Sequence, residues 1–289
     1  MKIKQTNSNE YVLPVVGTLF PLMLLIVLSI ASRGLYAGEL SHAEKYCDSS
    51  TEDSYCVFTS HYSGIIESTD IDKFKAMFKT TEHHISHLYQ NTYSEIFLDS
   101  EGGDVESALK IGKLIRAHQG QTFVSGECYS SCVIILAGGV VRGAAIELAG
   151  YILPNGSKVG IHRPYTIAEG TYEEHRHEFH ELENQIKQFF REGGVSEKLW
   201  DDMVMMPPES LKLLSQQEAI DYGLAGEDPA YADFVDGKKA KQYGIPRDTY
   251  LERKRMVKEE CDSNKQILSD TTGKELERCK QNILHGRTP

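Results

Sequence analysis

A serine flanked by two cysteines is the first feature of this sequence that could carry out chemistry. Ser130 stands between Cys128 and Cys132, in a run that begins after Gly126 and continues as an apolar stripe. A strand expected at 121–125 leads into this run, and a helix is expected to begin near Ser130. Backbone N–H groups and the helix dipole favour negative charge at a helix N-terminus, so a nucleophilic serine would gain from this position. The alternative is an ordinary N-capping serine.

A pair of glycines forms the second candidate feature. Gly102 and Gly103 follow a short apolar strand that is expected to end at Ser100. Glycines at a strand-to-helix turn leave backbone N–H groups unshielded, and such groups can bind a developing oxyanion. The alternative is a tight turn in which Asp104 caps the next helix.

A histidine completes the set of residues. His162 is the last residue of the stretch "KVGIH". It follows a short apolar strand and precedes Arg163 and Pro164. A serine needs a base to become nucleophilic at neutral pH, and histidine is the usual one. Lys158 offers a different base, in a Ser–Lys scheme, but His162 is the better supported of the two.

Hydrophobic periodicity predicts the elements that must position these residues. Helices are expected at 71–90, 105–118, 132–139 and 171–194, and strands at 94–100, 121–125 and on both sides of a turn at 154–156. Residues 56–68 are expected to form a strand pair or hairpin around Gly64. Strands that alternate with helices predict a mainly parallel sheet with crossover helices.

Together these segments resemble the proteolytic subunit of the Clp protease family, which has the ClpP/crotonase fold. The motifs that carry the resemblance are Gly102-Gly103, the Gly-x-x-x-Ser turn from Gly126 to Ser130 with its apolar helix ending in Gly138-Gly139, Ile161-His162-Arg163-Pro164, and "LLSQQEAIDYGLAG" at 213–226. The likeness runs from about Gly64 to Gly226. Exported bacterial members that carry C-x-S-x-C around the serine are the most similar. The resemblance implies an α/β fold of ClpP/crotonase type, with mainly parallel sheets, crossover helices and a helical C-terminal extension.

The resemblance also assigns roles to individual residues. Ser130 would be the nucleophile, His162 its general base, and the N–H groups of Gly103 and Ser131 the oxyanion hole. The segment Gly102-Gly103 would pair with an extended peptide as an added strand. The implied reaction is acyl transfer to serine followed by hydrolysis. No cofactor and no metal are expected, and a metal site at the histidines of 175–180 is the less favoured alternative.

Two departures from the family pattern bear on catalysis. The family has an aspartate four residues before the serine of the downstream motif, and here that place is taken by Leu211. Glu209 is the nearest acid and the tentative third member of the site, whereas Asp201 and Asp202 lie further back. Without an orienting acid, the site would be a Ser–His dyad or would not catalyse. An insert, "ELAGYILPNGS" at 147–157, also lengthens the interval between the serine and the histidine.

The N-terminus predicts export. Lys2 and Lys4 precede an uncharged apolar stretch at 12–31, which is about the length that spans a bilayer. By the positive-inside tendency, the remainder of the chain lies outside the cytoplasm, in the periplasm or secreted. Residues 1–37 are therefore expected to be either a cleaved signal peptide or a membrane anchor, and the sequence leaves both open.

Six cysteines follow this segment, and an even number outside the cytoplasm predicts disulfides. Pairing of neighbours is the simplest scheme: Cys47–Cys56, Cys128–Cys132 and Cys261–Cys279. We expect the middle pair to lie on one face of a helix and to clamp the turn that presents Ser130. The alternative is two buried free thiols. The zinc interpretation is weak because no C-x-x-C spacing occurs.

Length and charge bound the remaining possibilities. The chain has 289 residues and a formal charge of −11, which argues against nucleic acid as a partner. We expect residues 38–237 to form the ClpP/crotonase-like domain and 238–289 the C-terminal extension. The favoured function is an exported serine hydrolase, a peptidase acting on short or unfolded peptides. The alternatives are a catalytically silent peptide-binding protein and, less favoured, an acyl-CoA enzyme. A homo-oligomer is compatible with the family, and no ATP-driven unfoldase is expected.

Overall fold

The computed structural model describes most of the chain after the N-terminal segment. The described residues are 37–41, 44–48, 55–84, 91–144, 157–164, 172–207, 209–263 and 273–288. Residues from Ala37 onward form one compact unit. The apolar stretch at 12–31 and the insert at 147–156 lie outside the described residues.

The fold is a mixed α/β sheet whose central strands are parallel. The strands are β1 (Glu39–Leu40), β2 (Glu44–Asp48), β3 (Tyr55–Ile66), β4 (Asn91–Gly103), β5 (Gln121–Tyr129), β6 (Val141–Gly143), β7 (Lys158–Ile161), β8 (Lys212–Leu213) and β9 (Gly226–Glu227). The order β1-β3-β4-β5-β6-β9 runs across the sheet, with β2 paired to β3 and β7 paired to both β5 and β8. Pairs β3–β4, β4–β5, β5–β6 and β5–β7 are parallel, and the outer pairs are antiparallel.

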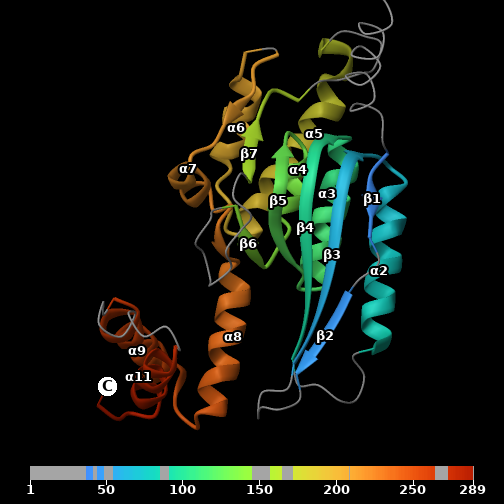
Figure 1. Cartoon of the computed structure of the whole chain (residues 1–289). Helices are drawn as coiled ribbons and strands as arrows, with labels where there is room; N and C mark the ends of the chain where they lie inside the picture. Colours follow the sequence, from blue (N-terminus) through green and yellow to red (C-terminus); the bar gives the residue numbers. More distant parts are fainter. Residues whose placement is uncertain are drawn as a thin grey trace, which may run out of the picture. The chain divides into compact units, whose positions relative to one another are not determined.

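Helices connect the parallel strands, as parallel pairing requires. They are α2 (Asp70–His84), α3 (Val105–Ala117), α4 (Cys132–Leu136), α5 (Tyr172–Glu192), α6 (Lys198–Met205), α7 (Gln216–Asp221), α8 (Pro229–Gln242), α9 (Arg247–Val257), η1 (Lys258–Asp262) and α11 (Lys274–Leu284). Figure 1 shows α3 and α4 together behind the central strands β3, β4 and β5. The α/β fold class expected from the sequence is confirmed.

Sequence patterning explains the placement of the helices that carry the core. Helix α3 begins at its cap Asp104, whose Oδ1 accepts a hydrogen bond from the Ser107 amide at 2.7 Å. All five residues of α4 are buried, as an uninterrupted apolar run predicts. The core between helices and sheet is built mainly from aliphatic and aromatic side chains, among them Ile96, Leu98, Val124, Ile134 and Phe190.

The hairpin expected around Gly64 is wrong. Residues 55–66 form the single strand β3, which stays paired with β4 on both sides of the glycine. The register shifts between Ser63 and Ile65, and Gly64 has a φ of 97° there. The Ser100 hydroxyl donates a hydrogen bond to the Gly64 carbonyl at 2.6 Å. Gly64 therefore serves a bulge in a continuous strand, where a positive φ suits glycine as well as it does in a turn.

Two strands extend further than the sequence predicted. Strand β4 does not end at Ser100 but continues through Gly103, because Gly102 and Gly103 pair with Ile65 and Ile66 of β3. Strand β5 continues beyond residue 125 to Tyr129. Both extensions bring strand ends close to Ser130, so they bear directly on the site.

The C-terminal helices have a small core of their own. Val257, Cys261, Cys279 and Ile283 form a buried cluster apart from the main core, and a disulfide joins the two cysteines. The boundary expected at residue 238 falls inside helix α8, which runs without a break from Pro229 to Gln242.

Candidate active site

Ser130 occupies a strained turn between β5 and α4. It has a φ of 55°, which is uncommon for a residue other than glycine. Its amide donates to the Gly160 carbonyl at 3.0 Å, and its own carbonyl accepts from the Val133 amide at 3.1 Å. Such a backbone costs about 1–3 kcal/mol and clusters at functional sites. The chain therefore holds this serine in a conformation that the surrounding structure must enforce.

Gly102 lies directly against the serine. A Cβ atom built on Gly102 would stand 2.7 Å from the Ser130 Cβ and 2.8 Å from the Tyr129 carbonyl oxygen. Gly102 also has a φ of 101°, so both its conformation and its surroundings require glycine. Gly103 is also linked to the serine turn, because the Ser131 hydroxyl donates a hydrogen bond to the Gly103 carbonyl at 3.0 Å. The structure thus brings Gly102, Gly103, Ser130 and Ser131 together.

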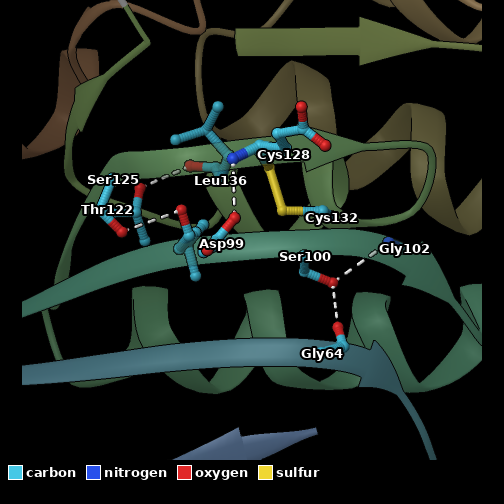
Figure 2. Close-up of a disulfide and its surroundings, with 11 residues drawn as sticks. Gly64, Asp99, Ser100, Gly102, Thr122, Ser125, Cys128, Cys132 and Leu136 are labelled. Carbon is cyan, nitrogen blue, oxygen red and sulfur yellow. Dashed lines mark hydrogen bonds between the residues drawn. A yellow bond between two sulfur atoms is a disulfide. The ribbon is translucent and has the colours of Figure 1, made fainter. Parts of the chain in front are cut away.

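A bulge in β5 positions the serine turn. Leu98 pairs with Val124 and Ser100 with Cys128, so a single residue of β4, Asp99, stands opposite three residues of β5. The Asp99 carboxylate accepts a hydrogen bond from the Glu127 amide at 2.8 Å and closes this bulge (Figure 2). Gly126 leaves room for the Asp99 carboxylate, because any side chain at this position would overlap it.

The bulge also divides the partners of β5. Before it, Thr122 and Phe123 pair with β6, and after it, 127–129 pair with β7. The Thr122 hydroxyl donates to the Leu136 carbonyl at 2.7 Å and so ties the end of α4 to the first half of β5 (Figure 2). Bulges often re-aim side chains next to functional sites, and this one delivers the end of β5, and Ser130 with it, to the edge shared with β7.

Replacing Asp99 is expected to misplace Ser130. Alanine at this position leaves the Glu127 amide without its acceptor, and the bulge can then relax. Because a misplacement of about 1 Å can lower a rate roughly a hundredfold, Asp99→Ala should reduce the labelling of Ser130 by an active-site-directed probe about ten- to hundredfold. Asp99→Asn retains an acceptor oxygen and should stay within about twofold of the wild type. Equal loss in both variants would contradict the role of the bulge.

A disulfide spans the serine turn. Cys128 of β5 and Cys132 of α4 are bonded, with their Cα atoms 5.2 Å apart, and both side chains are fully buried (Figure 2). The expectation that both cysteines lie on one helix face is wrong, because Cys128 belongs to the strand and α4 begins only at Cys132. The bridge therefore joins the two elements on either side of Ser130. The other cysteines pair as Cys47–Cys56 and Cys261–Cys279.

His162 directly follows β7, the parallel partner of β5. Tyr129 pairs with Gly160, so Ser130 and His162 stand just beyond the carboxyl ends of neighbouring parallel strands, at one edge of the sheet. The His162 Nδ1 atom lies 2.7 Å from the Arg163 carbonyl oxygen. Lys158, the other base considered, lies four residues earlier and pairs with Glu127 at 3.2 Å.

Two of the acids that the sequence offers near Leu211, Asp201 and Asp202, have partners of their own. Strand β8 is antiparallel to β7 and pairs Lys212 with Ile161, which puts Leu211 opposite His162 as the register continues. Asp201 pairs with Lys187 at 2.6 Å, and Asp202 with Lys198 and with the Tyr222 hydroxyl.

Burial disfavours the charged form of Asp202, but these hydrogen bonds outweigh it and lower the pKa of the carboxyl below its ordinary value. Glu209 is exposed, with a φ of 61°, two residues before Leu211. Its role as a third member stays a prediction.

Three acidic side chains, those of Asp99, Glu101 and Glu127, act on Tyr129 next to the serine turn, and Lys158 pairs with Glu127. Burial raises the pKa of Tyr129 to about 12, aided by a hydrogen bond with Glu127 and by the negative charges of Asp99 and Glu101. These side chains alternate with the buried residues of β4 and β5 and so share the outer face of the sheet.

Two expectations from the sequence concern residues of which the structure describes only part. The side chains of His175 and His177 are not described, and His180 is exposed, 3.7 Å from Glu183. Within the described residues, no three metal-ligating side chains come together. None of the helices in the described ranges is both long and apolar enough to cross a membrane.

Sequence reasoning missed several residues of the site. Asp99, the Gly160 carbonyl and the Ser131 hydroxyl each hold the serine turn through a contact that is distant in the sequence. The one local signal was Gly126, whose missing side chain marks a close approach.

The fold and the site define a class: a parallel α/β protein that presents a serine from a strained strand-to-helix turn, against a glycine-containing strand. The sequence matches the Clp protease family over residues 66–227, more than half of its length, and the chain belongs to that family. No curated protein matches it.

Proposed function

We propose that this protein is an exported serine peptidase in which Ser130 is the nucleophile and His162 its general base. The observation that carries the proposal is the strained conformation of Ser130, with a φ of 55° in a turn enforced by Gly102, Asp99 and a disulfide. Energy stored in such a conformation is typical of a functional residue. Membership in the Clp protease family supports peptides as the substrate class.

The proposed reaction follows the chemistry of serine hydrolases. The Ser130 Oγ attacks the peptide carbonyl carbon while its proton moves to His162, and the C–N bond breaks as the histidine returns the proton to the leaving amine. Water then hydrolyses the acyl-enzyme. The N–H groups of Gly103 and Ser131 would hold the oxyanion, supported by the contact between these two residues.

The peptide would lie extended along Gly102-Gly103. One edge of this segment is already paired with β3, so the peptide would have to use the groups on the side of Ser130. This arrangement would carry the scissile carbonyl past the serine turn.

A fluorophosphonate probe tests the proposal, because it reacts with activated serines. The wild-type protein should be labelled on Ser130, Ser130→Ala should not be labelled, and His162→Gln should be labelled at least about a hundredfold more slowly. Ser263→Ala is the control, since this exposed serine at the end of η1 belongs to the C-terminal helices, and labelling should persist. Absence of labelling in the wild type, with correct folding, would contradict the proposal.

A second function is favoured by one specific observation. Leu211 stands where the resemblance places an aspartate. The register of β8 against β7 puts this leucine opposite His162. A site without an orienting acid would suit a catalytically silent protein that binds extended peptides in the same groove. In that case the wild type and Ser130→Ala would both remain unlabelled, and both would bind an unfolded peptide probe with equal affinity in fluorescence polarisation.

Export and assembly form the last part of the proposal. Three disulfides support an oxidising compartment outside the cytoplasm, with residues 12–31 as membrane anchor or signal peptide. There the peptidase would act without an ATP-driven unfoldase, on short or unfolded peptides, and the family supports a homo-oligomer. Mass spectrometry of unreduced protein isolated from cells and alkylated after denaturation should find no free thiol, and alkylated Cys128 would contradict the compartment.

A further inference from the structure

The acid position of the site is filled by an aliphatic side chain. Pairs Gly160–Leu213 and Ile161–Lys212 fix the register of β8, so Leu211 stands opposite His162. Opposite residues in an antiparallel pair share a face. The Leu211 Cδ1 atom lies 2.9 Å from the position that a Cβ of Gly160 would take, which places the leucine over β7 on this face. A leucine has no acceptor, so it cannot orient an imidazole.

A different acceptor contacts the histidine ring. The His162 Nδ1 atom lies 2.7 Å from the Arg163 carbonyl oxygen, within hydrogen-bond distance. A carbonyl oxygen can only accept, so Nδ1 must carry the proton. In a neutral imidazole the lone pair is then on Nε2, which is the tautomer that a general base for serine requires.

The carbonyl itself is held in place from two sides. The Arg163 side chain donates from Nε to the Val204 carbonyl at 2.8 Å and so ties the residue to the end of α6. Pro164 follows directly, and a proline restricts the preceding residue to extended backbone conformations. The acceptor is therefore fixed before any substrate arrives.

We propose that the backbone carbonyl of Arg163 positions His162 by accepting the Nδ1 proton, which makes Arg163 a positioning residue of the proposed Ser–His pair. This inference rests on the proposed function. During the reaction the Ser130 proton moves to Nε2, the Nδ1 proton stays on Nδ1 and is donated in a hydrogen bond to the Arg163 carbonyl, and the Nε2 proton then passes to the leaving amine. A carbonyl dipole stabilises the imidazolium less than a carboxylate does, so this site is set for slower turnover than one in which a carboxylate accepts the Nδ1 proton.

The tautomer of His162 provides the direct test. The full-length protein in detergent, labelled with ¹⁵N at histidine, would be examined by NMR at neutral pH, and His162→Gln would assign the signal. The expected signature is a protonated Nδ1 and an unprotonated Nε2. Arg163→Ala should weaken this preference, because the anchor to Val204 is lost. A protonated Nε2 in the wild type would overturn the inference.

Leu211→Asp places a carboxylate opposite His162 and tests the same idea by rate. It should raise the rate of fluorophosphonate labelling about tenfold, whereas the isosteric Leu211→Asn should stay within about twofold of the wild type. Equal rates for the aspartate and asparagine variants would overturn the inference. The two proposals fail separately: labelling of Ser130 with a protonated Nε2 removes only the positioning role. If the wild type is not labelled but Nδ1 is protonated, only the proposed peptidase function is contradicted.

Discussion

Gly102→Ala is expected to slow the labelling of Ser130 more than a hundredfold. The new Cβ would meet the Ser130 Cβ at 2.7 Å and the Tyr129 carbonyl oxygen at 2.8 Å, and both atoms belong to the backbone turn or are bonded to it. Neither can move without shifting the serine. The φ of 101° adds a backbone strain of roughly 1–3 kcal/mol for any residue with a side chain. Because displacements of about 1 Å already cost about a hundredfold, the loss should exceed that value.

A matched glycine separates this effect from a general one. Gly237 lies inside α8, where nothing stands within 4 Å of an added Cβ. Gly237→Ala should leave the labelling rate unchanged and raise the free energy of unfolding by up to about 1 kcal/mol, as alanine does in a helix. The probe reaction and urea denaturation measure both quantities. Wild-type labelling by Gly102→Ala would show that the serine turn does not depend on close contact with β4.

The sequence predicted those features of the fold that depend on residues adjacent in the chain. The strand-to-helix turn at Ser130 is a local pattern, in which glycine and small polar residues separate two apolar runs. The end of α5 is local in the same way: the helix stops at Glu192, and Gly194 takes the left-handed conformation with a φ of 68°. Family membership was predictable because several such local motifs follow one another in a specific order.

Contacts between strands could not be predicted in the same way. Gly64 carries the same signal in a bulge as in a hairpin turn, and only the pairing of β3 with β4 on both sides decides between them. Asp99 lies in a run that the sequence predicts only as a strand, yet its carboxylate closes a bulge 28 residues further along the chain. The orientation of His162 depends on its own neighbour and on the register of β8, neither of which a periodicity reveals.

Three separate constraints converge on one residue. Gly102 leaves just enough space for the turn, and Asp99 fixes the path of β5 into the turn. The disulfide joins the end of β5 to the first residue of α4. A serine at a φ of 55° would otherwise relax toward a common conformation. We infer that the main purpose of the Cys128–Cys132 bridge is to hold this conformation, and that its contribution to global stability is secondary.

Removing single disulfides distinguishes these two contributions. In the chain-entropy model, a bridge stabilises more when it closes a longer loop, and the sequence separations are 4 for Cys128–Cys132 and 18 for Cys261–Cys279. The double variant Cys128→Ala/Cys132→Ala should therefore lose about 2 kcal/mol of unfolding free energy, and Cys261→Ala/Cys279→Ala about 3 kcal/mol. The labelling rate should follow the opposite order: a loss of about tenfold or more for the first variant, and little change for the second.

Substitution is preferable to reduction for this comparison, because Cys128 and Cys132 are fully buried and a thiol reagent cannot reach them in the folded protein. Urea denaturation and the rate of fluorophosphonate labelling are then measured on the same samples. If the Cys128/Cys132 variant is labelled at the wild-type rate, the bridge does not hold the nucleophile. If both variants lose labelling in proportion to their stability, the bridges act only on the fold. A large loss of labelling in the less destabilised variant is the result that the geometry of the serine turn requires.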